Sequence, residues 1–190
     1  MPTLTLWQIN LCAWYLLLIA WGIGALKNKP VKATEPSASR LLYGICFVSG
    51  FVLLFSNTLP LGGLRQRFLP RSEWIGLVGI VLSYAGAAIA IWASFILADN
   101  WSARITVKIG HELIRSGPYA YVRHPIYSGI LLSVVGTALL VSEWRALLAI
   151  VLVAISFTMK AKREEAYMTA EFGDLYSDYQ QGTGFLLPKV

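Results

Sequence analysis

Long stretches without charge alternate with short polar segments along this chain. No Asp, Glu, Lys or Arg occurs at residues 1–26, 41–64 or 74–98. Each stretch exceeds the roughly 20 apolar residues that a helix needs to cross a bilayer. Two further uncharged stretches follow at 125–142 and 146–159, and the second is either a short span or half of a hairpin packed inside a bundle. The pattern predicts an all-α, multi-pass integral membrane protein with about five transmembrane helices.

The polar positions divide the chain into two parts. Residues 1–98 are expected to form three N-terminal transmembrane helices that carry little chemistry. Residues 99–190 hold most of the polar residues, and we expect a catalytic region made of a cytosolic loop, a helical pair and a C-terminal amphipathic helix. That last helix is predicted as a cytosolic segment over 160–180, with an interruption at Gly173. In the third apolar stretch, small residues recur every four positions (Gly79, Ser83, Ala87), which favours close helix packing in lipid.

The distribution of charge predicts an orientation in the membrane. The net charge is +6, from 16 basic and 10 acidic residues. Segments 27–40, 99–124 and 160–190 hold four Lys or Arg residues each, whereas the opposite loops hold four in total. The positive-inside rule therefore places these three segments in the cytosol and the N-terminus on the other side. Topology and anionic membrane lipids account for the basic character, so we expect no nucleic-acid partner.

The most informative stretch is HELIRSGPYAYVRHPIYSG, residues 111–129, a long polar insertion between apolar segments that holds both histidines. Pro125 is typical of the first turn of a helix, and the free N–H groups of such a helix end attract an anionic group. Glu164 and Glu165 are expected where the fifth span leaves the membrane, and paired carboxylates there favour a bound cation. With several tyrosines nearby, these features match S-adenosylmethionine, which has an amino-acid tail, a sulfonium and an adenine. Two cysteines in separate helices have no zinc spacing, so no metal is expected.

Several spaced motifs then identify a family. The matching blocks are His111-x-Leu113-Ile114, Gly117-Pro118-Tyr119, Arg123-His124-Pro125-x-Tyr127-x-Gly129, Glu164-Glu165, Phe172-Gly173-x-x-Tyr176-x-x-Tyr179 and the ending Gly182-Thr183-Gly184-Phe185-Leu186. In these blocks, residues 101–190 resemble the isoprenylcysteine carboxyl methyltransferase family, within the wider group of membrane methyltransferases that includes phospholipid N-methyltransferases. The first hundred residues resemble the family only in being hydrophobic helices.

The resemblance implies an S-adenosyl-L-methionine-dependent methyltransferase that acts on a lipid or prenylated acceptor from the bilayer, preferably the carboxyl group of an isoprenylcysteine-type substrate. The cofactor contacts that it implies are His111, Glu112, Leu113, Ile114, Tyr119, His124, Pro125, Ile126, Tyr127 and Glu164. Arg123 and Glu165 are the implied catalytic residues. Glu165 is expected to be the solvated neighbour of an inward-pointing Glu164, and Arg123 to anchor a lipid phosphate or pair with one of the glutamates.

One position departs from the family pattern. Lys160 stands where the family has an arginine near the acceptor, and we assign it to substrate binding. Lysine keeps the positive charge but lacks the planar guanidinium with which arginine binds both oxygens of a carboxylate.

Three other functions remain open at the level of the sequence. The first is a phospholipid or other small-lipid N-methyltransferase. The second is a membrane reductase of the sterol-reductase type, although the chain has no G-x-G-x-x-G nucleotide fingerprint. The third is a non-enzymatic membrane protein that has kept the fold.

Overall fold

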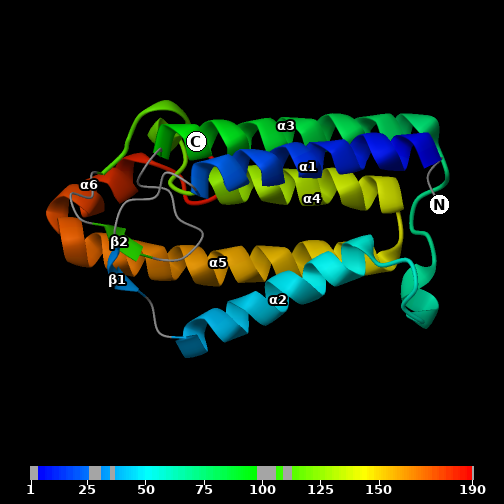
Figure 1. Ribbon diagram of the computed structural model, residues 1–190, viewed down its shortest axis with the longest axis horizontal. Helices are drawn as coiled ribbons and strands as arrows, with labels where there is room; N and C mark the ends of the chain where they lie inside the picture. The colour runs from blue at the N-terminus through cyan, green and yellow to red at the C-terminus, as the bar shows by residue number, and fades with distance from the viewer. Residues whose placement is uncertain (1–3, 26–30, 35–36, 98–105, 109–112, 190) are drawn as a thin grey trace.

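Five long α-helices and one short α-helix make up most of the described part of the chain (Figure 1). The computed structural model describes residues 4–25, 31–34, 37–97, 106–108 and 113–189. The helices are α1 (Leu4–Ala25), α2 (Ser37–Phe55), α3 (Glu73–Leu97), α4 (Pro125–Val141), α5 (Trp144–Phe172) and α6 (Asp174–Gly182), with short 3-10 turns η1 (Gly62–Arg65) and η3 (Gly117–Ala120). The predicted all-α class is confirmed.

The long helices are apolar enough for a membrane. By length and composition, three segments could cross a bilayer, at Thr5–Ile23, Glu73–Leu97 and Trp144–Phe172, and two shorter apolar helices lie at Arg40–Phe55 and Pro125–Val141. Large apolar side chains are exposed on the outer faces of these helices, as lipid contact requires. The chain is thus built as an integral membrane protein, and the number of five spans stays a prediction.

A small sheet adds to the predicted helices. Strands β1 (Val31–Thr34) and β2 (Thr106–Lys108) pair antiparallel, with Thr34 opposite Thr106. They bring the connection after α1 to the connection after α3, and both lie at the end of the bundle where α6 lies (Figure 1). The described parts of the three segments that the charge pattern groups together therefore share one end of the bundle. Which side of the membrane this end faces stays a prediction.

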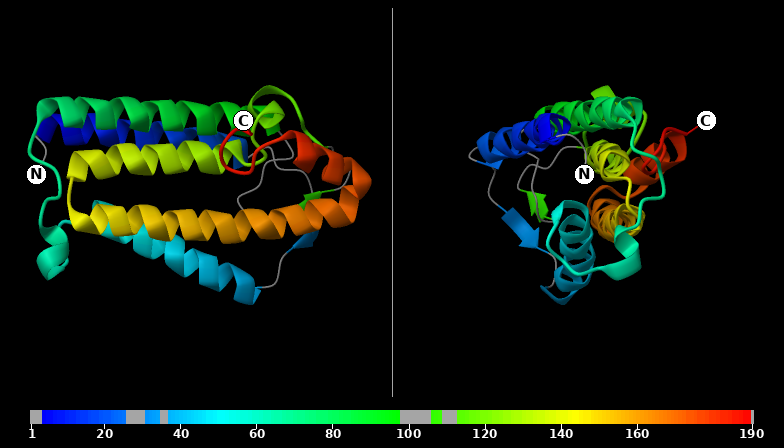
Figure 2. Two further views of the ribbon diagram at one scale, coloured as in Figure 1. Left: turned by 180° about the vertical axis from the view of Figure 1, so that it is seen from behind. Right: turned by 90° about the vertical axis from the view of Figure 1, so that its right-hand side faces the viewer.

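The helices pack as two groups that meet at α4. Figure 2 shows α1, α3 and α4 side by side, with α5 and α2 beneath them. The predicted small-residue packing is present, because Gly79, Ser83 and Ala87 are all buried on α3. A Cβ atom added at Gly79 would lie 2.6 Å from the carbonyl oxygen of Gly136 on α4. The absence of side chains at this contact lets the two backbones approach closely.

Polar side chains inside the bundle are satisfied by partners on other helices. Asn10 Nδ2 and Trp14 Nε1 of α1 both donate to Thr137 Oγ1 of α4, at 3.2 and 3.0 Å. Ser133 Oγ of α4 donates to the carbonyl of Ser83 on α3, at 2.9 Å. These bonds tie α1, α3 and α4 together inside the bundle, where the four polar side chains are buried.

A buried arginine joins α2 to α5. Arg145 is 2% exposed, and its Nε lies 2.6 Å from Oε2 of Glu143. Its Nη1 donates to the carbonyls of Leu53 and Ser56, which are left without helical partners where α2 ends. A side chain that the sequence places in a loop thus closes the end of a neighbouring helix.

The C-terminal helices differ from the prediction in one respect. Helix α5 runs without a break from Trp144 to Phe172, so the expected separate cytosolic helix over 160–180 is wrong in its first half. The predicted interruption at Gly173 is confirmed, since this residue has φ of +54° and separates α5 from α6. Continuity of α5 places Lys160, Glu164 and Glu165 on one rigid helix beside the start of α4.

Candidate functional site

The start of α4 is held by the C-terminal tail, residues 183–189, which follows α6. Pro125 is the first residue of the helix, as predicted, and His124 precedes it as the N-cap residue. The backbone N–H of Arg123 donates to the carbonyl of Gly184 at 2.9 Å, and that of His124 donates to Phe185 at 3.3 Å. The tail therefore holds the backbone in place at Arg123 and His124.

His124 lies between the two glutamates of α5. Its Nδ1 is 3.5 Å from Oε2 of Glu164, and its Nε2 is 3.3 Å from Oε1 of Glu165. Burial lowers the pKa of His124, but hydrogen bonds to Glu164 and Glu165 outweigh burial, and the net pKa is raised above its ordinary value of 6.5. The geometry thus favours an imidazolium with both N–H groups directed at carboxylates.

Arg123 joins Glu165 to the C-terminal tail. Its Nε lies 2.6 Å from Oε1 of Glu165, while its Nη1 donates to the carbonyls of Gln180 and Thr183, at 3.1 and 2.5 Å. Of the two roles predicted for Arg123, the structure shows ion pairing with a glutamate. The expectation that Glu165 is solvated is wrong, because its side chain is 15% exposed and that of Glu164 is 22% exposed. Arg123 and the tail cover Glu165.

Aromatic rings extend from this cluster into the bundle. Tyr127 donates its hydroxyl to Oε1 of Glu164 at 2.5 Å, and its ring stacks between His124 and Phe157, with centroid distances of 5.6 and 4.7 Å. Lys160 Nζ lies 5.2 Å from the centroid of the Tyr127 ring. The site therefore brings together carboxylates, positive charges and aromatic rings where the start of α4 meets the second half of α5.

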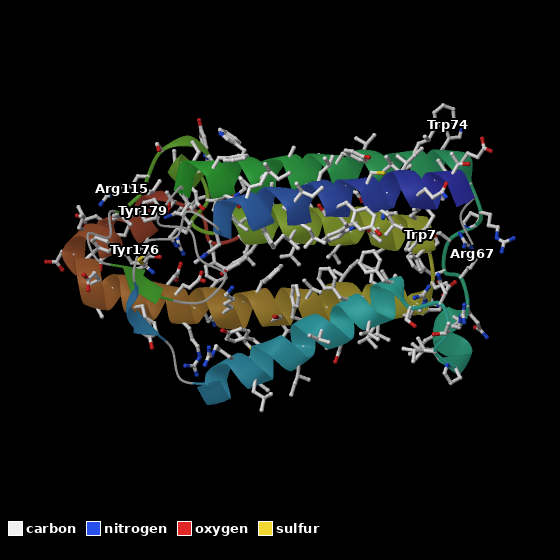
Figure 3. The ribbon with its side chains drawn as sticks, viewed as in Figure 1. Trp7, Arg67, Trp74, Arg115, Tyr176 and Tyr179 are labelled. Atoms are coloured by element: carbon white, nitrogen blue, oxygen red, sulfur yellow. The ribbon has the colours of Figure 1, made fainter. Side chains whose placement is uncertain are left out.

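Helix α6 closes the same end of the molecule. Tyr179 donates its hydroxyl to the carbonyl of the buried Tyr119 at 2.7 Å, and the guanidinium of Arg115 lies 5.6 Å above the Tyr179 ring. Figure 3 shows Arg115, Tyr176 and Tyr179 gathered at this end. Burial raises the pKa of Tyr179 to about 12, although Arg123 and Arg115 oppose the shift, so the hydroxyl stays protonated and can donate.

The remaining predicted positions lie close by or outside the described part of the chain. Ile114 and Leu113 are half-buried, and Ile114 packs against the hydrophobic core. Pro125 and Ile126 are buried in the first turn of α4. His111 and Glu112 lie outside the described residues. Within those residues, no three His, Cys, Asp or Glu side chains are grouped as a metal site.

Three side chains that contact the site were not predicted as site residues. Phe157 precedes Glu164 by two helical turns on α5, a spacing that could have revealed it. Phe185 packs edge-on against His124 with a centroid distance of 5.2 Å, and Gln180 Nε2 donates to Oε2 of Glu165 at 3.1 Å. Phe185 lies in the family ending at residues 182–186, a signal that could have indicated it, whereas no local pattern distinguishes Gln180.

Comparisons with known proteins agree with this arrangement. Residues 77–170 match the model of the isoprenylcysteine carboxyl methyltransferase (ICMT) family. Protein-S-isoprenylcysteine O-methyltransferase B of Arabidopsis thaliana is 30% identical over 78% of this chain and 77% of its own length. The Tribolium castaneum protein-S-isoprenylcysteine O-methyltransferase is 27% identical over 78% of this chain and 52% of its own length.

A solved structure has a similar fold. The eukaryotic intramembrane Ras methyltransferase ICMT superposes with a TM-score of 0.57 and 25% identity, over 78% of this chain and 52% of that one. The chain spans about half the length of several curated relatives that it matches, and most of the Arabidopsis relative. On the match to the family model and the extent of the Arabidopsis alignment, the chain belongs to the isoprenylcysteine carboxyl methyltransferase family.

Proposed function

We propose that this protein is an S-adenosyl-L-methionine-dependent methyltransferase that acts on a lipid-like acceptor in the membrane, preferably the carboxyl group of an isoprenylcysteine-type substrate. The observation that carries the proposal is the network in which His124 contacts both Glu164 and Glu165 while Arg123 pairs with Glu165. Membership of the family supports the reaction class, and relatives named protein-S-isoprenylcysteine O-methyltransferase support the acceptor.

The donor set of the site suits this cofactor. Glu164 offers a carboxylate to an ammonium or a sulfonium, and the Tyr127 hydroxyl holds that carboxylate in place while Phe157 packs on the Tyr127 ring. The start of α4 and the His124 ring are suited to a carboxylate. The residues proposed to hold the cofactor are the ten implied by the family resemblance, from His111 to Glu164.

The residues of the chain mainly have to align the reactants and exclude water. The chemistry that S-adenosylmethionine supplies when bound is a methyl group on a sulfonium, which an acceptor displaces in line. A carboxylate acceptor is already nucleophilic and needs no base, whereas an amine must first lose a proton, which the Glu164 carboxylate could then accept. Arg123 and Glu165 are proposed as the catalytic pair that keeps the His124 side of the site in place.

Lys160 is proposed to contact the acceptor. It lies one helical turn before Glu164 on α5, and its ammonium group lies above the ring of Tyr127. From this position its charge could attract an acceptor carboxylate without the bidentate grip of an arginine. The site end of the bundle is proposed to face the cytosol, so that the cofactor enters from water and the acceptor from the lipid.

Cofactor binding tests the proposal directly. Calorimetric titration of the detergent-purified protein with S-adenosylmethionine and S-adenosylhomocysteine should give saturable binding. Glu164→Gln and His124→Gln should weaken it about tenfold to a hundredfold, as expected for lost hydrogen bonds to charged groups. Glu73→Gln, at the opposite end of the bundle, is the matched control and should bind normally. Absence of binding to a folded wild-type protein would refute the proposal.

Product analysis separates the proposed acceptor from the nearest alternative. Radiolabelled methyl groups transferred to a prenylcysteine analogue should be released by base, because a methyl ester is base-labile. A base-stable product formed with phosphatidylethanolamine would instead indicate a phospholipid N-methyltransferase.

A further inference from the structure

Helix α6 brings one neutral polar side chain into the charged cluster. Residues Tyr176 and Tyr179 of this helix are buried, and Gln180 beside them is half-buried, whereas Gln181 is exposed. Gln180 Nε2 lies 3.1 Å from Oε2 of Glu165. Because an ionised carboxylate has no hydrogen to donate, the amide must direct its N–H at this oxygen.

Gln180 contacts both members of the ion pair between Arg123 and Glu165. Its side chain donates to Glu165, and its backbone carbonyl accepts from Nη1 of Arg123 at 3.1 Å. The two oxygens of Glu165 are thereby divided. Oε1 faces Arg123 and His124, at 2.6 and 3.3 Å, and Oε2 faces Gln180.

We propose that Gln180 is a positioning residue for this site, which holds Oε2 of Glu165 so that Oε1 stays directed at His124. Without this amide, the Glu165 carboxylate can rotate about its Cγ–Cδ bond. It can then accept a second hydrogen bond from the guanidinium of Arg123. Two parallel hydrogen bonds of this bidentate kind are the preferred geometry of an arginine and a carboxylate. It would draw Oε1 away from His124, whose ring would then face only Glu164.

The charges around His124 make this effect measurable. Glu164, Glu165 and Lys160 lie on α5, and Arg123 precedes His124 in the chain, whereas α6 faces the cluster with the uncharged Gln180. Glu165 is one of the two carboxylates whose hydrogen bonds raise the pKa of His124. Loosening Glu165 should therefore lower that pKa, an effect that a loss of general stability would not produce.

The decisive experiment compares two adjacent glutamines in the full-length protein. Gln180→Met keeps the length of the side chain and removes the amide, and Gln181→Met makes the same change on the exposed neighbour. Histidine NMR gives the pKa of His124, with its signal assigned by its loss in His124→Gln. We expect a lower pKa in Gln180→Met and an unchanged one in Gln181→Met. Equal pKa values in both variants would overturn the inference.

A second readout rests on the proposed function. Titration with S-adenosylmethionine should show about tenfold weaker binding in Gln180→Met, the effect of one lost hydrogen bond to a charged group, and unchanged binding in Gln181→Met. If the wild type fails to bind the cofactor, the proposed function fails while the NMR comparison still decides the role of Gln180. Gln180→Glu is the second variant should Gln180→Met not fold, and it should also displace Glu165, by repulsion.

Discussion

Arg123 and Glu165 form a 2.6 Å ion pair although 42 positions separate them in the chain. The pair links the start of α4 to the last turns of α5, and the same guanidinium holds the tail through the carbonyls of Gln180 and Thr183. Three segments that carry the family motifs are thus joined by one side chain. The integrity of this junction is the basis of the first two predictions.

Arg123→Lys should release the C-terminal tail. Lysine can keep the charge beside Glu165 but cannot also reach the carbonyls of Gln180 and Thr183, because it lacks the second arm of the guanidinium. Hydrogen–deuterium exchange should show the Gly184 amide, which is bonded to Tyr121, exchanging about tenfold faster, as expected for the loss of one such bond. Arg163→Lys, at an exposed position of α5, should leave this amide unchanged.

The His124 cluster should stabilise the protein mainly at low pH. Burial lowers the pKa of His124, but its hydrogen bonds to Glu164 and Glu165 raise the net value above 6.5. A raised pKa contributes stability that is fully present below pH 6.5, the ordinary value, and is lost as the pH rises through the folded value. The melting temperature of wild type minus that of His124→Gln should therefore shrink as the pH rises. A melting-temperature difference that stays constant as the pH rises would contradict the raised pKa of His124.

Gly86→Ala should destabilise the contact between α3 and α4. A Cβ atom at this position would collide with the carbonyl of Gly129, so the two helices would have to separate, at a cost of about 1–3 kcal/mol. Gly44→Ala on α2 is the matched control, because a Cβ there meets no atom within 4 Å. Thermal unfolding in detergent should show a lower midpoint for Gly86→Ala and an unchanged or higher one for Gly44→Ala.

Arg145→Met should be among the most destabilising single changes at the opposite end of the bundle. It leaves the Glu143 carboxylate without its 2.6 Å partner and the end of α2 without a donor, at a cost of about 3–5 kcal/mol. Arg71→Met, which removes an exposed arginine from the same end, should change stability little. Similar unfolding midpoints for the two variants would show that the buried pair contributes nothing.

Local patterns were enough to predict the helices and part of the site. The turn at Gly173 and the start of α4 at Pro125 follow from backbone chemistry, since glycine allows a positive φ and proline suits a first turn. The extent of α5 could not be predicted in this way. Its charged second half has the composition of a surface helix, and only packing against α4 and α6 shows that it continues the apolar half without a break.

Of the contacts around Glu165, pairing of Arg123 with a glutamate was one of two roles predicted for that arginine, whereas the contact with Gln180 could not be predicted. Its solvated state was expected because the residue follows Glu164 on a charged stretch, yet Arg123 and Gln180 cover it from two other segments. The Gln180 contact has no local sequence pattern, since it depends on how the chain folds back after Gly173.

The amino-acid sequence by itself determined that this chain is built for a membrane, that α4 begins at Pro125 and that the chain turns at Gly173, because hydrophobicity, proline and glycine act on neighbouring positions. Only the tertiary structure decided that His124 lies between two glutamates, and that Arg145 closes α2. These contacts join segments distant in the chain, and their geometry arises only when the helices pack and charged groups away from water must find partners.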